Sequence, residues 1–279
     1  MKIDDVDISE DKVVVVGDPN LVIRGRRGLF ALNRYSPIGR SMMWYGEHGE
    51  NELNFCAQFI EKGSLVIDIG AHQGTHTKAF SEMVGPAGFV YSFEPQRLMY
   101  LNMCATLALN SIENVCAVNL AIGDISGSVR IAEFDYHRRG HFSGMRISSE
   151  NTGELIDLLP LDQWLESKER RDVGFLKVDV EGMEIKVLQG CLNAIKTHQP
   201  IIYHEFHADD TEHGSALRDF HRMNGYEVFR HAPYGFNPNN FFAHEDDRFK
   251  GGQDHNVLAI PRSKSERYAS QTAGLQRLS

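Results

Sequence analysis

The chain has 279 residues, 42% of them apolar and 24% charged, so it can bury a full hydrophobic core as one domain with extensions. No apolar run approaches the roughly 20 residues of a membrane span and no secretory segment opens the chain, which predicts a cytoplasmic protein. A net charge of −9 argues against general nucleic-acid binding, and the wide spacing of four cysteines argues against disulfides and a thiolate zinc site.

The predicted elements begin with a hairpin and continue as alternating strands and helices. Residues 13–16 and 21–23 bracket Gly17-Asp18-Pro19-Asn20, whose composition is typical of a turn. The pattern then predicts, in order, a buried strand at 65–69, a helix at 75–84, a strand at 88–94, a helix ending at 110 and a strand at 115–120. We expect residues 1–45 to form an N-terminal extension and residues 46–261 to form the main domain.

The second half of the chain opens with an irregular insertion at about 126–160, which holds a pair of strands around 129–134 and 155–159. Regular order then resumes with a helix at 162–169 capped by Asp162, a strand at 173–178, a helix at 183–196, a strand at 200–205, a helix at 215–224 and strands at 226–230 and 256–260. This alternation predicts an α/β fold whose mostly parallel sheet is covered on both faces. Residues 262–279 are polar and are expected to be disordered.

The most informative segment runs from Leu65 to Thr77. An apolar strand delivers Asp68 and then the turn Gly70-Ala71-His72-Gln73-Gly74 to the start of a helix. Glycines let a ligand approach the backbone closely, and the first N–H groups of a helix point outward. Glu94 ends the next strand, where an acid usually binds the hydroxyls of a ribose. The glycine spacing lacks the G-x-G-x-x-G of dinucleotide folds, so the sequence predicts a smaller nucleoside ligand.

Polar residues also end two later strands. Asp179 and Glu181 follow the strand at 173–178, and His204 and Glu205 close the strand at 200–205. Ligands of open α/β sheets lie at this edge of the sheet, and alternate residues of a strand face the same side. We therefore expect these four side chains to meet beside the glycine turn.

Taken together, these segments resemble the FkbM family of S-adenosylmethionine-dependent methyltransferases over residues 43–261. The resemblance is carried by Tyr45-Gly46-Glu47, residues 66–74, Phe93-Glu94-Pro95, residues 161–165, residues 176–184 and Asn256-Val257-Leu258. It implies a class I methyltransferase, Rossmann-like fold with a seven-stranded, mostly parallel sheet, helices on both faces and an antiparallel last strand. It also implies O-methylation, often of a sugar hydroxyl or a related small polar substrate.

The resemblance assigns most of the cofactor site to the first half of the chain. Gly70 and Gly74 would let the backbone pass under the methionine portion of S-adenosylmethionine, and Glu94 would bind the ribose hydroxyls. Asp68 would orient the turn or meet the amino group, directly or through water. Apart from the resemblance, Asp179 at the later strand end is expected either to contact the amino end of the cofactor or to bind a metal ion.

Further assignments concern the adenine and the cover of the site. Backbone near Ala121 would close the base pocket, with Asp124 either at the adenine amino group or serving only as a turn carboxylate. His72 stands where the family more often has Asn, and either side chain can donate a hydrogen bond. The family motif also suggests that Tyr45 and Glu47 cover the cofactor.

Two interpretations of the catalytic chemistry remain open at this point. An acceptor hydroxyl must lose its proton, so His204 could act as general base while Glu181 positions the hydroxyl, with Glu205 as the alternative base. In the second interpretation, Asp179, Glu181 and Glu205 or His204 bind a divalent cation such as Mg²⁺, which lowers the pKa of the hydroxyl.

The sequence thus predicts a cytoplasmic O-methyltransferase whose partner is a small-molecule hydroxyl acceptor, a sugar or glycosylated intermediate. Tyr234, Phe236 and Phe241 belong to an expected surface loop and would either stack on a sugar or pack beneath the loop. The alternatives are methylation of a nucleic acid or a protein, or an inactive S-adenosylmethionine-binding partner domain. Four polar residues at one sheet edge argue against an inactive domain.

Overall fold

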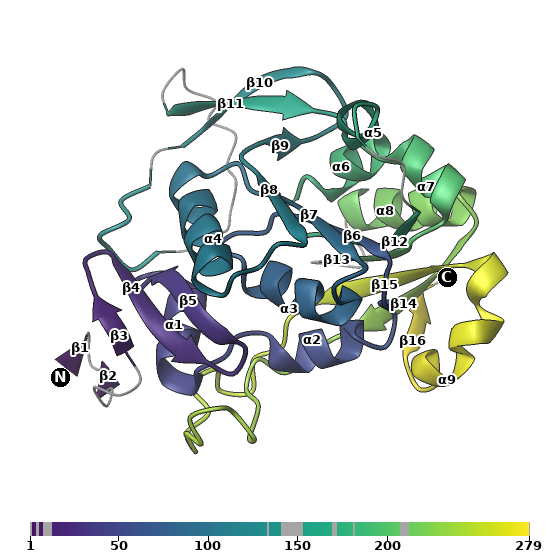
Figure 1. Cartoon of the computed structure of the whole chain (residues 1–279). Coiled ribbons are helices and arrows are strands. Elements are labelled where there is room, and N and C mark those ends of the chain that lie inside the picture. The colour runs from purple at the N-terminus through teal and green to yellow at the C-terminus, as the bar shows by residue number, and fades with distance from the viewer. Residues whose placement is uncertain are drawn as a thin grey trace.

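The structure is a computed structural model that describes residues 2–3, 6–7, 13–132, 134–140, 153–168, 172–180, 182–206 and 212–278. At its centre is an eight-stranded sheet with the strand order β16-β14-β15-β13-β12-β6-β7-β8 (Figure 1). The strands are β6 (Leu65–Ile69), β7 (Phe89–Phe93), β8 (Val115–Val118), β12 (Val173–Val178), β13 (Ile201–Glu205), β14 (Tyr226–His231), β15 (Asn256–Pro261) and β16 (Gln276–Leu278).

The direction of the strands agrees with the fold expected from the sequence. Strands β8, β7, β6, β12 and β13 are parallel to one another. Strand β15 is antiparallel to both of its neighbours, as expected for the last strand of the seven. Strand β16 adds an eighth strand by pairing antiparallel with β14. The predicted α/β, class I type of sheet is therefore confirmed, with one strand more than expected.

Helices cover both faces of the sheet (Figure 1). One face packs against α2 (Glu50–Cys56), α3 (Thr75–Val84) and α4 (Arg97–Leu109). The other packs against α5 (Leu161–Leu165), α6 (Glu184–Gly190), α7 (Leu192–His198) and α8 (Glu212–Met223). Strand β6 is apolar on both sides because Leu65, Ile67 and Ile69 enter one core and Val66 enters the other, as expected for a central parallel strand.

The N-terminal region forms a second sheet beside α4 (Figure 1). The expected hairpin lies between β3 (Val13–Val16) and β4 (Asn20–Gly25), and the chain continues into β5 (Gly28–Asn33) and helix α1 (Pro37–Tyr45). Strands β1 (Lys2–Ile3) and β2 (Val6–Asp7) pair only with each other. Ser36 caps α1, since its hydroxyl oxygen accepts a hydrogen bond from the Gly39 amide at 2.9 Å.

The insertion and the tail also contain regular elements. Strands β9 (Ala121–Ile122), β10 (Gly127–Ile131) and β11 (Glu154–Leu159) make a small sheet, which places the expected strand pair slightly earlier in the chain. The tail was expected to be disordered, but residues 262–278 form two 3₁₀ turns, helix α9 (Ala269–Thr272) and β16. Throughout the described ranges, no helix is both long and apolar enough to cross a membrane.

Two local predictions were wrong. The helix expected at 183–196 is divided into α6 and α7 at Cys191. Asp162 does not cap its own helix, which starts after Pro160. Its carboxylate instead accepts hydrogen bonds from the amides of Asn193 and Ala194 at 2.7 and 2.9 Å. It therefore stabilises the start of α7, where free N–H groups need an acceptor.

Candidate active site

A cavity opens at the carboxyl ends of β6, β7 and β12, which is the edge that the sequence predicted for a ligand. Its wall contains five residues that the sequence assigned to the cofactor: Gly70, His72, Glu94, Ala121 and Asp179. The remaining wall residues are mostly apolar: Ile38, Ile69, Phe93, Pro95, Gln96, Leu120, Ile122 and Val180. An apolar pocket with a few polar groups is the usual form of a small-molecule site.

The glycine turn is held between two strands. The amides of Gly70 and Ala71 both donate to the carbonyl oxygen of Phe93, at 2.9 and 3.0 Å. Gly70 has φ +82°, and a Cβ atom there would lie 1.8 Å from the carbonyl oxygen of Asp179. Glycine is therefore required by the close approach of β12 as well as by the left-handed backbone. Gly74 also has φ +82° but lies against Met103 of α4, outside the cavity wall.

Glu94 connects this turn to β7. One carboxylate oxygen accepts a hydrogen bond from the His72 amide at 2.8 Å, and the other accepts from the Gln96 amide at 2.7 Å. The side chain is only 3% exposed, and this burial raises the pKa of Glu94 to about 7 despite the two N–H donors. Carboxylate oxygens have further lone pairs, so Glu94 can still accept hydrogen bonds from a ribose diol.

His72 provides an independent sign that the cavity receives a polar ligand. Its ring is buried in the cavity wall, and neither ring nitrogen has a hydrogen-bond partner among the described residues. Burial, with the nearby His48 and Lys177, lowers the pKa of His72 to about 3, so the ring is neutral. Buried polar atoms are nearly always satisfied, and a cofactor in this cavity would supply the partner. The residues present therefore fit the expected nucleoside.

Asp68 and Asp124 lie outside the cavity wall. Asp68 is fully buried, and its carboxylate accepts a hydrogen bond from the Thr77 hydroxyl at 2.7 Å. This hydrogen bond links the end of β6 to the first turn of α3. Asp124 is exposed in the turn after β9, which fits the simpler expectation of a turn carboxylate.

Lys177 contacts Asp179, one of the residues that the sequence offered as a metal ligand. Its Nζ atom lies 2.9 Å from an oxygen of Asp179 and 3.8 Å from one of Asp68. Partial burial opposes ionisation of Asp179, but the Lys177 ammonium outweighs it and holds the pKa of that carboxyl below its usual value. Within the described ranges, no three His, Cys, Asp or Glu side chains are grouped to hold a metal ion. The His204 ring, which was expected to lie beside Asp179, contacts His221 of α8.

His204 is an interior histidine, and its proposed role as general base does not fit this geometry. Its ring is 1% exposed, Nδ1 lies 2.8 Å from the Glu205 carbonyl oxygen, and Nε2 lies 2.8 Å from Nε2 of His221 in α8. Both ring nitrogens are thus engaged, and burial lowers the pKa of His204. Glu205 ends β13 and is half-buried, while Glu181 lies outside the described residues.

A different histidine cluster, which sequence reasoning missed, lies beside the cavity. Nε2 of His76 is 3.3 Å from a Glu52 carboxylate oxygen, and the His48 ring meets the His76 ring edge to face at 6.5 Å. His48 interacts electrostatically with His72 and Asp179, both in the cavity wall. Burial and the neighbouring His76 lower the pKa of His48 to about 4. In the sequence, only their positions could have indicated these two histidines: His48 follows the Tyr45-Gly46-Glu47 motif, and His76 follows the glycine turn.

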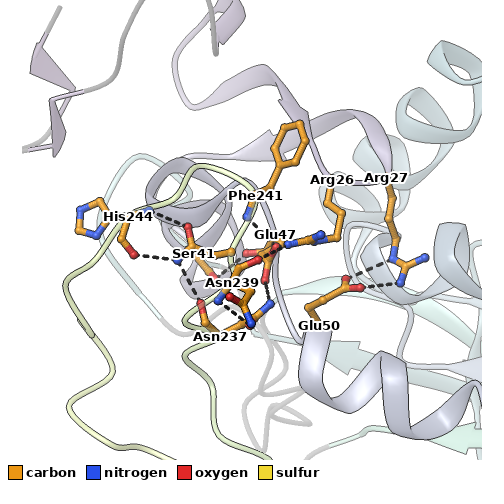
Figure 2. A network of polar contacts seen from close by, with 10 residues as sticks. Arg26, Arg27, Ser41, Glu47, Glu50, Asn237, Asn239, Phe241 and His244 are labelled. Atoms are coloured by element: carbon orange, nitrogen blue, oxygen red, sulfur yellow. Dashed lines mark hydrogen bonds and ion pairs between the residues drawn. The ribbon is translucent and has the colours of Figure 1, made fainter.

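Tyr45 and Glu47 hold a loop, and neither belongs to the cavity wall. Figure 2 shows Glu47 between Arg26 on one side and Asn237 and Phe241 on the other. Its carboxylate lies 2.6 Å from Arg26 and accepts hydrogen bonds from the Asn237 side chain at 2.7 Å and the Phe241 amide at 2.9 Å. The Tyr45 hydroxyl donates to the Asp246 carbonyl at 3.0 Å. This motif therefore fixes residues 232–255 against the N-terminal region.

Comparison with known proteins shows which family this chain matches. Residues 68–228, more than half of the chain, match the family described as the methyltransferase FkbM domain. A search of curated proteins finds no match. One similar solved structure is the methyltransferase FkbM from Methylobacillus flagellatus KT, with 18% identity and a TM-score of 0.46, covering 72% of this chain and 44% of that one. This chain therefore spans less than half the length of that relative.

Two further structures are similar at comparable levels. Fibrillarin from Aeropyrum pernix, with natively bound S-adenosyl-L-methionine, has 13% identity and a TM-score of 0.46, covering 91% of this chain and all of that one. An O-methyltransferase from Bacillus cereus, in complex with SAH, has 13% identity and a TM-score of 0.44, covering 76% of this chain and 80% of that one. Because these identities and TM-scores are low, the family assignment depends on the match of residues 68–228 to the family. This chain belongs to the FkbM family of S-adenosylmethionine-dependent methyltransferases.

Proposed function

We propose that this methyltransferase acts on a hydroxyl group of a sugar or another small polar intermediate. S-adenosylmethionine, when bound, supplies an electrophilic methyl group on a cationic sulfur. Glu94 would hold the ribose hydroxyls, Ala121 and its apolar neighbours would cover the adenine, and Gly70 and His72 would face the methionine portion. These roles use the residues that line the cavity.

The observation that supports hydroxyl chemistry is the neutral His48 ring, which lines a separate small pocket and interacts electrostatically with Asp179 and His72 of the cavity wall. Its Nδ1 atom is buried and has no hydrogen-bond partner in the part of the chain that the structure describes. With a pKa of about 4, the ring is unprotonated at neutral pH and can accept a hydrogen bond from an acceptor hydroxyl. The hydroxyl proton then moves to Nδ1 of His48.

The surrounding charges support this proton transfer. Glu52 and Asp179 both favour a positive charge on His48, whereas burial and His76 oppose it. A base with so low a pKa holds a proton only weakly at rest, but a carboxylate nearby stabilises the imidazolium as it forms. Because His48 stays unprotonated above about pH 4, the ascending limb that a base of ordinary pKa would produce near pH 6.5 is not expected.

The first test replaces this histidine. His48→Ala is expected to lower kcat by about 10²–10⁴-fold and to leave the Kd for S-adenosylhomocysteine within about twofold of wild type, because proton removal matters only as the transition state forms. The assay follows isotopically labelled methyl transfer to a panel of neutral glycosides, and NMR identifies the methylated oxygen. His198→Ala is the control, since His198 lies in α7 and pairs with Asp172 at 3.2 Å.

Three outcomes would contradict the proposal. Unchanged kcat in folded His48→Ala would remove His48 from the reaction. Transfer of the methyl group to nitrogen or carbon atoms would exclude O-methylation. Transfer to RNA or protein in preference to every small acceptor would favour the alternative substrate classes.

A further inference from the structure

A groove with an aromatic wall lies next to the histidine cluster, between the start of α2 and the loop that joins β14 to β15. Its lining includes Asn51, His231, Tyr234, Phe236 and Asp247. Figure 1 shows this loop running close to α1 and α2. Tyr234 is 59% exposed, which leaves its ring available to a ligand.

The groove wall is fixed before any ligand arrives. The Asn51 side-chain amide donates hydrogen bonds to the carbonyls of Tyr234 at 2.7 Å and Phe236 at 3.0 Å. The two carboxylate oxygens of Asp247 accept from the amides of Phe249 at 2.8 Å and Gly251 at 2.7 Å. A preformed wall costs less entropy when it binds, because its side chains do not have to be ordered at that moment.

The Glu47 network fixes the other arm of the same loop. Asn237 and Phe241 are both bound to the Glu47 carboxylate, which is itself paired with Arg26 (Figure 2). Arg26 also donates to the Asn239 carbonyl at 2.5 Å. The Glu47 side chain is 6% exposed, whereas Arg26 is partly exposed. The Glu47 carboxylate is therefore largely removed from water, and this strengthens its hydrogen bonds.

The groove is also in the right place to hold an acceptor. Asn51 is followed directly in α2 by Glu52, whose carboxylate contacts His76 of the cluster. The His231 ring stacks on Phe55, also in α2, with ring centroids 3.7 Å apart. Burial lowers the pKa of His231 to about 4, and the Glu52 carboxylate acts in the opposite direction. A molecule with one hydroxyl at His48 could therefore extend into the groove.

We propose that this groove binds a neutral sugar ring of the acceptor, stacked on Tyr234, and thereby sets substrate specificity. The inference rests on the proposed function, because it assigns the part of the acceptor that is not methylated. A pyranose has an apolar C–H face that suits an aromatic ring and hydroxyl edges that suit the polar rim. The Asp247 carboxylate disfavours phosphate or uronate groups at the same place, so the ring should carry no charge.

The test measures glycoside binding separately from methyl transfer. Saturation-transfer NMR with protein saturated with S-adenosylhomocysteine uses neutral methyl hexopyranosides and methyl maltoside as probes. Tyr234→Ala should weaken the Kd of the best glycoside about 3- to 10-fold, the range of an aromatic stacking contact, while Tyr234→Phe keeps wild-type affinity. Phe241→Ala is the matched control, because it removes a 44% exposed aromatic ring of the same loop outside the groove lining and keeps the backbone amide that binds Glu47.

Glu47→Gln should also weaken glycoside binding, because it loosens the loop that carries Tyr234. It raises the KM for the glycoside more than it lowers kcat, and it leaves the Kd for S-adenosylhomocysteine unchanged, since Glu47 lies outside the cofactor cavity. Failure of the groove assignment can be distinguished from failure of the proposed function. Methyl transfer to a hydroxyl with no effect of Tyr234→Ala on glycoside affinity overturns the groove assignment alone. Absence of glycoside binding to the wild-type protein also overturns it, and an N-methylated product overturns the proposed function.

Discussion

Glu94 illustrates how burial sets the chemistry of a single side chain at the cofactor site. Its carboxyl group is 3% exposed, and burial raises its pKa to about 7, although the amides of Gln96 and His72 act in the opposite direction. Only the ionised form accepts hydrogen bonds through both oxygens without presenting a proton of its own. Protonation near neutral pH therefore competes with ribose binding.

We expect the affinity for 5′-methylthioadenosine to increase with pH. This probe keeps the ribose diol but lacks the amino acid groups that would titrate themselves. Its Kd should fall about tenfold between about pH 6 and about pH 8, because a group of pKa about 7 changes from mostly protonated to mostly ionised. Calorimetry on Glu94→Gln should show weaker binding with no pH dependence. A pH-independent Kd in the wild-type protein would exclude Glu94 as the ribose ligand.

The residues of the cavity wall were easier to predict from the sequence than the proposed general base. Gly70 and Glu94 belong to one turn and the strand that follows it, so local spacing brings them together. Whether His204 or Glu205 can act as the base depends on the face of β13 that each side chain occupies. His204 pairs in register with Val178, on the face that packs against α6 and α8, and alternation puts Glu205 on the opposite face. The alternation of side chains can be read from the sequence, but the register of β13 against β12 cannot.

At the scale of elements, the N-terminal sheet is a structural support of the cofactor turn. Gln73 lies inside that turn with no exposed surface. Its side-chain oxygen accepts a hydrogen bond from the Asn33 amide at the end of β5, and its Nε2 atom donates to the Ser36 hydroxyl at 2.8 Å. The segment expected to be an extension thus stabilises the binding loop, and Ile38 of α1 completes the cavity wall.

Gln73→Ala should therefore destabilise the protein and weaken cofactor binding together. It leaves the buried Asn33 N–H without its acceptor, which costs about 1–3 kcal/mol of unfolding free energy, and it releases the turn from β5. Urea unfolding and calorimetry with S-adenosylhomocysteine measure the two effects. Gln58→Ala is the control because Gln58 is exposed after α2. Equal behaviour of the two variants would show that β5 does not support the turn.

Element boundaries followed from the sequence where a strand is apolar on both sides or a helix has a clear stop. Helix α3 and strand β12 have the predicted limits, and Gly85-Pro86 follows the helix as expected. The role of Asp162 could not be predicted, because its hydrogen-bond partners Asn193 and Ala194 are distant in sequence. The order of the C-terminal tail depends on burial of Tyr268 against Phe59, another contact between distant residues.

For the whole molecule, the cavity and the C-terminal tail lie at opposite ends of one sheet. The cavity is at the carboxyl ends of the parallel strands, beside Ile69 and Phe93. The tail lies at their amino ends, where Tyr268 is 5% exposed, joins the core cluster that includes Val66 and Phe175, and has its ring centroid 5.4 Å from that of Phe59. A defect in the tail should therefore change stability without changing the cofactor site.

Tyr268→Ala tests this separation. Removing a buried aromatic side chain leaves a cavity in the core and should lower the unfolding free energy by about 3–5 kcal/mol. The Kd for S-adenosylhomocysteine, measured well below the melting transition, should stay within about twofold of wild type because the turn between β6 and α3 is far from the lesion. Tyr268→Phe keeps the ring and loses only the 3.3 Å contact of the hydroxyl with Glu61, so it should cost about 1 kcal/mol or less. If Tyr268→Ala weakened cofactor binding while Tyr268→Phe did not, the two ends of the sheet would be coupled through its core, and the tail would contribute to function as well as to stability.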